Sequence, residues 1–396
     1  MLFAVYAATL GTHAVPAHRL SAAGAHVLMT TESIVSDHDV DLRNQYREHA
    51  WRKWYRGELH PTARPDGAGR ILEPHGAGLP LLLAPVWAIG GVIGVRLFLA
   101  ALAAIAFACA ASLGRRIVPE PWATAAALIV GLSAPVVAAS TTVRPEIPCA
   151  AALAGAAVLA LRIRDRPEAA VAFWAALLVA VVPWLGLTAA APAIVVALAL
   201  ARWLRRRQRG LAGFVALEVV FTSAVVFVTI NDRLYGGLTP YASGARPGPS
   251  TGLHDAGDVL ARVPRIFEIL GQLWWVPFLM LTLVGVWLLW RSRRTRLASA
   301  IPDQVNVEVV AAFMGLVVLA QVLEAAFLAP RIAGPWFHAR LLVPALPFAA
   351  ALAAWGLRRF PRTGAVLGVA TVGLAVWVLV GALAGDATLA PLRGLY

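Results

Sequence analysis

The sequence contains very few of the residues from which metal centres and redox motifs are built. Only two cysteines occur, Cys109 and Cys149, and both lie inside apolar runs without metal-ligand spacing. Charged residues make up only 14% of the chain, and Lys53 is the only lysine. No P-loop, dinucleotide-binding fingerprint, zinc-protease motif or nucleophile elbow occurs. These absences exclude a cysteine metal site and argue against a cytosolic nucleotide as the donor of a transferred group.

Long apolar runs make up most of the chain. Hydrophobic residues account for 60% of its 396 residues and the mean hydropathy is +0.73, whereas soluble domains are about 45–50% apolar. A helix crosses a bilayer in about 20 residues, and the runs fit about eleven spans. We therefore predict an all-α, polytopic transmembrane bundle in a single domain over residues 1–396. It comprises a first span at 1–16, an outer loop at 17–91 and the remaining spans in 92–396.

Short arginine clusters close alternate apolar runs. They contain seventeen of the 34 Lys and Arg residues. The positive-inside rule places these ends in the cytoplasm. The longest cluster adjoins a span and is not part of a recognisable nucleic-acid-binding motif. We therefore expect contact with anionic lipid and no nucleic-acid partner. The clusters are Arg115–Arg116, Arg162–Arg166, Arg202–Arg209, Arg291–Arg296 and Arg358–Arg362.

Several segments outside the spans predict helices at the membrane interface. Residues 78–91 contain two prolines and end in Gly90-Gly91, too short and too broken for a span. Residues 259–270 repeat apolar side chains at helical spacing, and residues 26–35 are similar. The predicted spans lie at 92–114, 121–141, 146–162, 168–184, 185–203, 211–230, 274–290, 307–328, 341–357 and 364–384.

The first outer loop concentrates ionisable residues. Asp37, Asp39 and Asp41 lie beside Arg43. Such acids at a membrane surface can deprotonate an acceptor hydroxyl or hold a divalent cation, Mg²⁺ or Mn²⁺, that binds phosphate. The alternative is a solvated turn with helix caps. Asp39 is our catalytic candidate from this run.

The same loop ends in Glu73-Pro74-His75-Gly76, at the mouth of the membrane. Because Pro and Gly fix the backbone around these side chains, we predict that His75 is catalytic and that Glu73 contacts substrate. The alternative is again a structural turn.

Two further groups lie at the outer ends of predicted spans. Arg144 and Glu146 flank Pro145 at the start of one span, and Arg340 opens another. Guanidinium groups bind phosphate, so we predict Arg144 and Arg340 as substrate ligands and Glu146 as catalytic. A helix-capping ion pair and an interfacial anchor are the alternatives. Tyr235 and Tyr241, near Gly236-Gly237, are candidates for a sugar or lipid pocket, and a structural turn is the alternative.

Taken in order, several of these stretches resemble the GT-C class of membrane glycosyltransferases, which includes protein O-mannosyltransferases and aminoarabinose transferases. The stretches are Ser33–Arg43, Glu73–Pro80, Arg115-Arg116, and Arg340 followed by Pro344 and Pro347.

This resemblance implies an inverting transfer of one sugar from a polyprenyl-phosphate carrier to a cell-envelope acceptor, at the outer face of a bacterial plasma membrane. It also implies that His26 contacts substrate. The sequence departs from the family at Ala23 and Gly24, where an acidic pair would fall. The alternatives are therefore a non-catalytic relative that binds polyprenyl lipids, or a membrane transporter.

Overall fold

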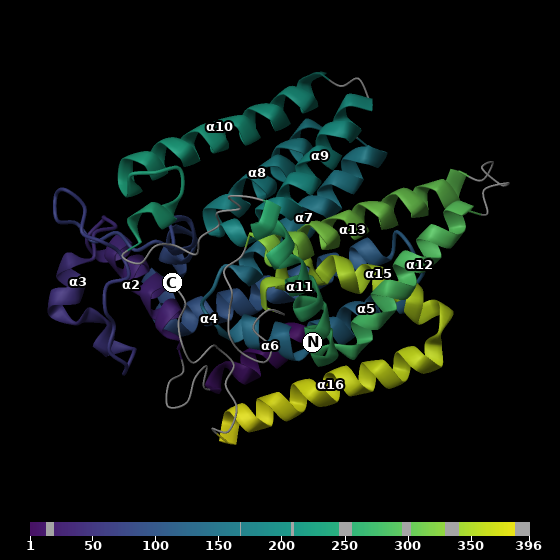
Figure 1. Cartoon of the computed structure of the whole chain (residues 1–396), viewed down its shortest axis with the longest axis horizontal. Helices are drawn as coiled ribbons and strands as arrows, with labels where there is room; N and C mark the ends of the chain where they lie inside the picture. Colours follow the sequence, from purple (N-terminus) through teal and green to yellow (C-terminus); the bar gives the residue numbers. More distant parts are fainter. Residues whose placement is uncertain are drawn as a thin grey trace.

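The computed structural model describes residues 1–12, 20–166, 168–206, 210–244, 256–294, 302–328 and 340–384. The chain forms an all-α membrane protein (Figure 1). Its helices are α1 (Leu2–Ala8), α2 (Ala22–Ser36), α3 (Arg43–Glu48), α4 (Gly78–Gly114), α5 (Trp122–Gly131), α6 (Ala134–Thr141), α7 (Glu146–Asp165), α8 (Ala169–Leu185), α9 (Ala190–Arg206), α10 (Gly210–Tyr235), α11 (Ala256–Gly271), α12 (Met280–Arg294), α13 (Pro302–Phe327), α15 (Leu346–Arg359) and α16 (Pro361–Ala384).

The number of helices that could cross a membrane is lower than the predicted number of spans. Six described helices are long and apolar enough, and a seventh span results if α5 and α6, bent by 61° at their junction, count as one. Helices α1, α8 and α12 are apolar but shorter. The polytopic all-α architecture is therefore confirmed, while the count of eleven stays a prediction.

Helix α4 is broken at Gly91. This residue has φ +53° and ψ −145° inside an otherwise helical segment, in the region of positive φ that glycine reaches without steric cost. The break separates residues 78–90 from the long apolar stretch at 92–114. This division matches the boundary that the Gly90-Gly91 pair predicted.

The core of the bundle is built around α7, which packs against α4, α8 and α9. Small residues allow close approach elsewhere: a Cβ on Gly285 of α12 would lie 2.5 Å from the Leu352 carbonyl oxygen of α15, and one on Gly356 would lie 2.6 Å from the Leu281 carbonyl oxygen. Such contacts are typical of helix pairs in membranes. By contrast, α10 and α16 run along opposite edges of the bundle (Figure 1) and expose apolar side chains such as Phe221 and Trp377.

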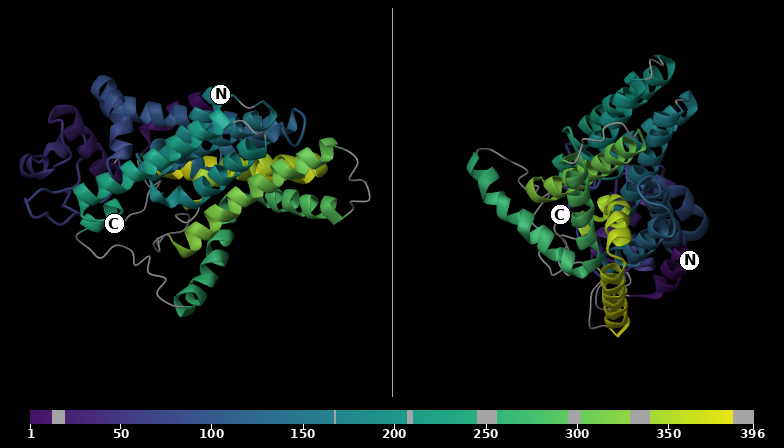
Figure 2. Two further views of the ribbon diagram at one scale, coloured as in Figure 1. Left: turned by 90° about the horizontal axis from the view of Figure 1, so that it is seen from above. Right: turned by 90° about the vertical axis from the view of Figure 1, so that its right-hand side faces the viewer.

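The arginine-rich helix ends gather at one end of the bundle. Arg116 pairs with Asp165, and Arg164 donates to Asn306 at the start of α13. The C-terminal end of α12, the start of α13 and the α15–α16 junction lie at this same end, opposite α2 and α3 (Figures 1 and 2). The structure thus has one basic end and one loop-bearing end, as the alternation of arginine clusters predicted.

Helix α2 differs from its predicted setting at the membrane surface. Residues 23–31 are buried on all sides, and the helix packs against α4. It also contacts η2 (Ala50–Lys53) of the outer loop, and Gly24 lies close to Val143. Helix α11, by contrast, projects from the bundle (Figure 2) and exposes Leu260 and Phe267, as expected of an interfacial helix.

Candidate functional site

A buried carboxylate organises the outer loop. Glu73 Oε1 accepts hydrogen bonds from Tyr46 Oη and from the Thr62 backbone N–H at 3.1 Å, and Oε2 accepts one from the Thr62 hydroxyl. Tyr46 Oη also lies 2.9 Å from His26 Nδ1, while Glu73 Oε1 is 3.7 Å from that nitrogen. Three segments far apart in the sequence therefore meet at Glu73.

The histidines of this region sit in a strongly desolvated setting. Burial lowers the pKa of His26, partly opposed by the charge of Glu73. The pKa of His75 falls to about 3, through burial and through the nearby His26 and Arg144. Burial and the charge of Glu73 raise the pKa of Tyr46. Both imidazoles are consequently neutral at physiological pH.

The segment between α6 and α7 links the loop to the bundle. Arg96 Nε of α4 donates to the Thr141 carbonyl oxygen at 3.1 Å. A Cβ on Gly24 would lie 3.3 Å from Val143 Cβ, and one on Gly186 would lie 3.0 Å from Pro145 Cβ. Residues 141–145 are thus contacted by α2, by α4 and by the α8–α9 turn. These contacts fix the backbone that carries Arg144 and Glu146.

Glu146 and Arg340 form an ion pair inside the protein. Arg340 Nε lies 2.9 Å from Glu146 Oε1, with side-chain exposures of 15% and 5%. Glu146 Oε2 is buried and accepts no hydrogen bond from any residue that the structure describes. A buried carboxylate oxygen normally has a partner, so this oxygen is available to a bound hydroxyl. Trp336–Ala339, which precede Arg340, lie outside the described residues.

We refer to His26, Tyr46, Glu73, His75, Arg144, Glu146 and Arg340 as the outer polar cluster. Its members come from α2, α3, the end of the outer loop, the start of α7 and the segment before η7 (Val343–Ala345). Six of its seven residues were predicted to be functional from the sequence. The structure places His26, Glu73 and His75 in one group and pairs Glu146 with Arg340, while Arg144 lies near His75 and two residues before Glu146.

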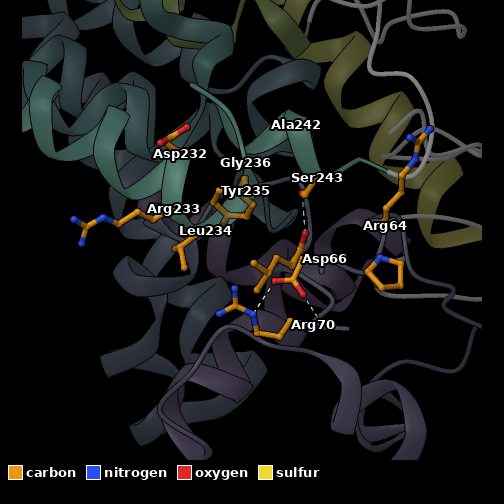
Figure 3. A pocket seen from close by; sticks show the side chains of 12 residues that line it. Arg64, Asp66, Arg70, Asp232, Arg233, Leu234, Tyr235, Gly236, Ala242 and Ser243 are labelled. Carbon is orange, nitrogen blue, oxygen red and sulfur yellow. Dashed lines mark hydrogen bonds and ion pairs between the residues drawn. The ribbon is translucent and has the colours of Figure 1, made fainter. Parts of the chain in front are cut away.

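Tyr235 and Tyr241 lie apart from this cluster. Tyr235 lines a cavity of about 280 Å³ between the outer loop and the residues after α10 (Figure 3). Arg70 pairs with Asp66 there, and Arg233 and Asp232 lie on the opposite wall. Tyr241 is 41% exposed in η4 (Pro240–Ser243) and does not line the cavity.

The acidic run of the outer loop is engaged in local structure. Asp39, which is exposed, accepts hydrogen bonds from the Ser33 hydroxyl and the Asp41 N–H. Asp37 accepts from Asn44 and Gln45, and Asp41 pairs with Arg43. In the described part of the chain no three His, Cys, Asp or Glu residues are grouped closely enough to hold a metal ion. A site for Mg²⁺ or Mn²⁺ therefore stays a prediction.

Sequence reasoning did not single out Tyr46, Thr62, Arg96 or Gln321. Gln321 Nε2 donates to the Thr188 and Leu341 carbonyl oxygens, and Glu324 accepts from the Ala190 and Ala191 backbone N–H groups. An arginine or acid inside an apolar run is itself a signal, and it could have identified Arg96. Tyr46 and Thr62 carry no comparable pattern.

Comparison with known proteins supports this architecture. The chain is similar to the crystal structure of ArnT from Cupriavidus metallidurans bound to undecaprenyl phosphate, with a TM-score of 0.54 and 15% identity. The match covers 96% of this chain and 63% of the ArnT chain. No protein-family model and no curated protein sequence matches. The resemblance to the GT-C class is thus confirmed at the level of fold, and the chain is a multi-pass membrane protein with an ArnT-like fold.

Proposed function

We propose that the chain is an inverting glycosyltransferase that takes a sugar from a polyprenyl-phosphate carrier and transfers it to a cell-envelope acceptor. The support is the ArnT-like fold, together with the undecaprenyl phosphate bound to ArnT itself. In this proposal the chain resides in a bacterial plasma membrane with its arginine-rich ends in the cytoplasm. If the shorter apolar helices α1, α8 and α12 also cross the membrane, the described residues supply ten spans, against the eleven predicted.

The observation that carries the proposal is the buried ion pair between Glu146 and Arg340. A carrier phosphate that approaches the loop-bearing end meets the guanidinium groups of Arg340 and Arg144, which match phosphate in charge and geometry. Glu146 Oε2 is then free to accept a hydrogen bond from the acceptor hydroxyl. Donor and acceptor are thereby held side by side, and such positioning supplies much of the rate of a two-substrate reaction.

The residues of the outer loop have distinct roles in this proposal. Glu73 holds the loop over the cluster through Tyr46 and Thr62. His75 and His26 face the reacting groups, while Asp39 stabilises the turn after α2. Tyr235 lines the separate cavity near η4, which we assign to the acceptor side, and Tyr241 lies beside it at the exposed surface of η4. No step of the proposed reaction passes through a metal ion.

A transfer assay tests this function. The purified chain is placed in vesicles with polyprenyl-phosphate sugars, and release of polyprenyl phosphate is measured. Wild type should release carrier, whereas Glu146→Gln should release it far more slowly. Glu48→Gln is the matched control, because Glu48 is an exposed carboxylate on α3. Equal turnover in wild type and Glu146→Gln would contradict the assignment of Glu146.

A second candidate function is non-catalytic binding of polyprenyl-linked lipids. The specific observation is Gly24, where a side chain would press against Val143, so the acid of an acidic pair would be crowded at this position. The sharper test is therefore Ala23→Asp alone. Activity that appears in Ala23→Asp and is absent from wild type would favour the binding function.

A further inference from the structure

The hydrogen bonds around Tyr46 determine which nitrogen of His26 carries the proton. Tyr46 has one O–H to donate. The two oxygens of Glu73 together accept from Tyr46, the Thr62 N–H and the Thr62 hydroxyl, an arrangement that suits an ionised carboxylate, which can only accept. The tyrosine proton therefore points to Glu73. The contact between Tyr46 and His26 must then be a donation from His26 Nδ1–H to the phenolic oxygen.

It follows that His26 is held with its Nε2 unprotonated. The imidazole is neutral, because burial lowers its pKa below the ordinary value of about 6.5. Among the described residues, none donates a hydrogen bond to His26 Nε2. In general bases of this type, one nitrogen of a neutral imidazole is held by a chain of hydrogen bonds that ends at a carboxylate. The other nitrogen is then free to accept a proton.

We propose that His26 Nε2 is the general base of the glycosyl transfer, and that Tyr46 and Glu73 are its positioning residues. This assignment rests on the proposed function and names the group that acts in place of the acidic pair missing at Ala23 and Gly24. His26 lies three residues after Ala23, on the same face of the first turns of α2. Its ring centroid is 6.1 Å from that of His75, which adjoins Arg144.

The chemical step balances with the groups named. The acceptor oxygen forms a bond to the anomeric carbon of the sugar as its proton passes to His26 Nε2. The bond between that carbon and the carrier phosphate oxygen breaks, and the electron pair leaves with the phosphate. The products are the glycosylated acceptor, polyprenyl phosphate and a His26 imidazolium, which then releases its proton to water. Arg144 and Arg340 stabilise the charge that develops on the leaving phosphate.

The variant that tests the base is His26→Asn. An Asn amide can still donate to Tyr46, but it offers no basic nitrogen. We expect a loss of turnover of about 10²–10⁴-fold, with polyprenyl-phosphate binding unchanged in a vesicle co-sedimentation assay. His38→Asn is the matched control, because His38 is exposed and its positive φ is one that Asn tolerates.

Two further readouts separate a base from a structural residue. The first is the imidazole nitrogen NMR of isotope-labelled histidine, which should show His26 as the Nδ1–H tautomer in wild type and lose it in Tyr46→Phe. The second is the pH profile of turnover. The charged and titratable groups that face His26 are Glu73, Tyr46, His60 and His75. Since the charge of Glu73 raises the pKa of His26, Glu73→Gln should move the acidic limb to lower pH.

The outcomes distinguish the base assignment from the proposed function. Undiminished turnover in His26→Asn, or an Nε2–H tautomer in wild type, would overturn the base assignment. Neither result would contradict the proposed glycosyltransferase function. A wild-type chain that binds the carrier and transfers no sugar would overturn both. Loss of turnover in His26→Asn with retained binding, together with the Nδ1–H tautomer, would support the base assignment.

Discussion

Glu73 and Glu146 are two buried carboxylates of the outer polar cluster, and their surroundings differ in one respect. Both oxygens of Glu73 accept hydrogen bonds from the loop itself. Glu146 has one oxygen in an ion pair with Arg340, and its other oxygen is buried without a donor among the described residues. A fully bonded carboxylate stabilises structure, whereas a partly bonded one is free to meet a ligand. Burial alone would not have separated the two roles.

The largest expected effect concerns Glu146. Glu146→Gln should reduce kcat/KM for sugar transfer by about 100-fold, because the acceptor loses its alignment with the donor. The measurement is carrier release in vesicles across a range of acceptor concentrations. Glu324→Gln is a second buried-carboxylate control, since Glu324 caps the start of α9 through the Ala190 and Ala191 N–H groups. A larger loss of kcat/KM in Glu324→Gln than in Glu146→Gln would contradict the role assigned to Glu146.

Glu73→Gln should act on stability as well as on turnover. The amide removes the charge that three donors share, and hydrogen bonds to charged groups are worth about 1.5–3 kcal/mol each. We expect the free energy of unfolding to fall by about 2 kcal/mol, with faster amide hydrogen exchange in residues 42–75. Glu58→Gln, at an exposed surface pair with Arg52, should leave both unchanged. An unchanged exchange pattern in Glu73→Gln would contradict the structural role.

The loop should also lose stability in acid. The pKa of His75 is lowered from 6.5 to about 3, so the unfolded chain binds this proton more readily than the folded chain does. Stability is therefore complete above pH 6.5 and falls as the pH drops towards 3, by up to about 1.4 kcal/mol per pH unit. Melting temperatures measured at several pH values should show this slope, and His75→Asn should flatten it. A slope that His75→Asn leaves unchanged would assign the effect to other groups.

The smallest expected effect is at Gly24. A Cβ at this position lies 3.3 Å from Val143 Cβ, so Gly24→Ala should destabilise the protein by about 1–2 kcal/mol through overpacking. Gly67→Ala is the control, because nothing lies within 4 Å of its added Cβ. Thermal unfolding of both variants checks the prediction. Equal melting temperatures would show that α2 has room to shift, and would make an acid at position 24 feasible.

Much of the fold could be predicted from the sequence because its signals are local. The arginine clusters indicated which helix ends share a side, and Gly90-Gly91 indicated the break in α4. Helix α2 was misplaced on the membrane surface because its mixed apolar and polar residues fit either an interface or a buried helix. Its packing against α4 is a tertiary contact that periodicity does not record.

The candidate site was only partly predictable for the same reason. Ionisable residues beside Pro and Gly or at the outer ends of apolar runs were visible in the sequence, so Glu146, His75 and Arg340 were identified. Tyr46 and Thr62 were not, because their roles depend on Glu73, which is 27 and 11 residues away in the chain. The hydrogen-bonding state of each carboxylate likewise emerges only when the chain is folded.

The central claim is that the outer polar cluster receives the phosphate end of a polyprenyl carrier. The most direct test is photo-crosslinking in vesicles with a polyprenyl phosphate whose photoreactive group adjoins the phosphate, followed by peptide mapping. Labelling should concentrate in residues 141–146 and 340–343 and should decline in an Arg340→Gln variant. Labelling confined to the basic end of the bundle, near Arg116 and Arg164, would contradict the account.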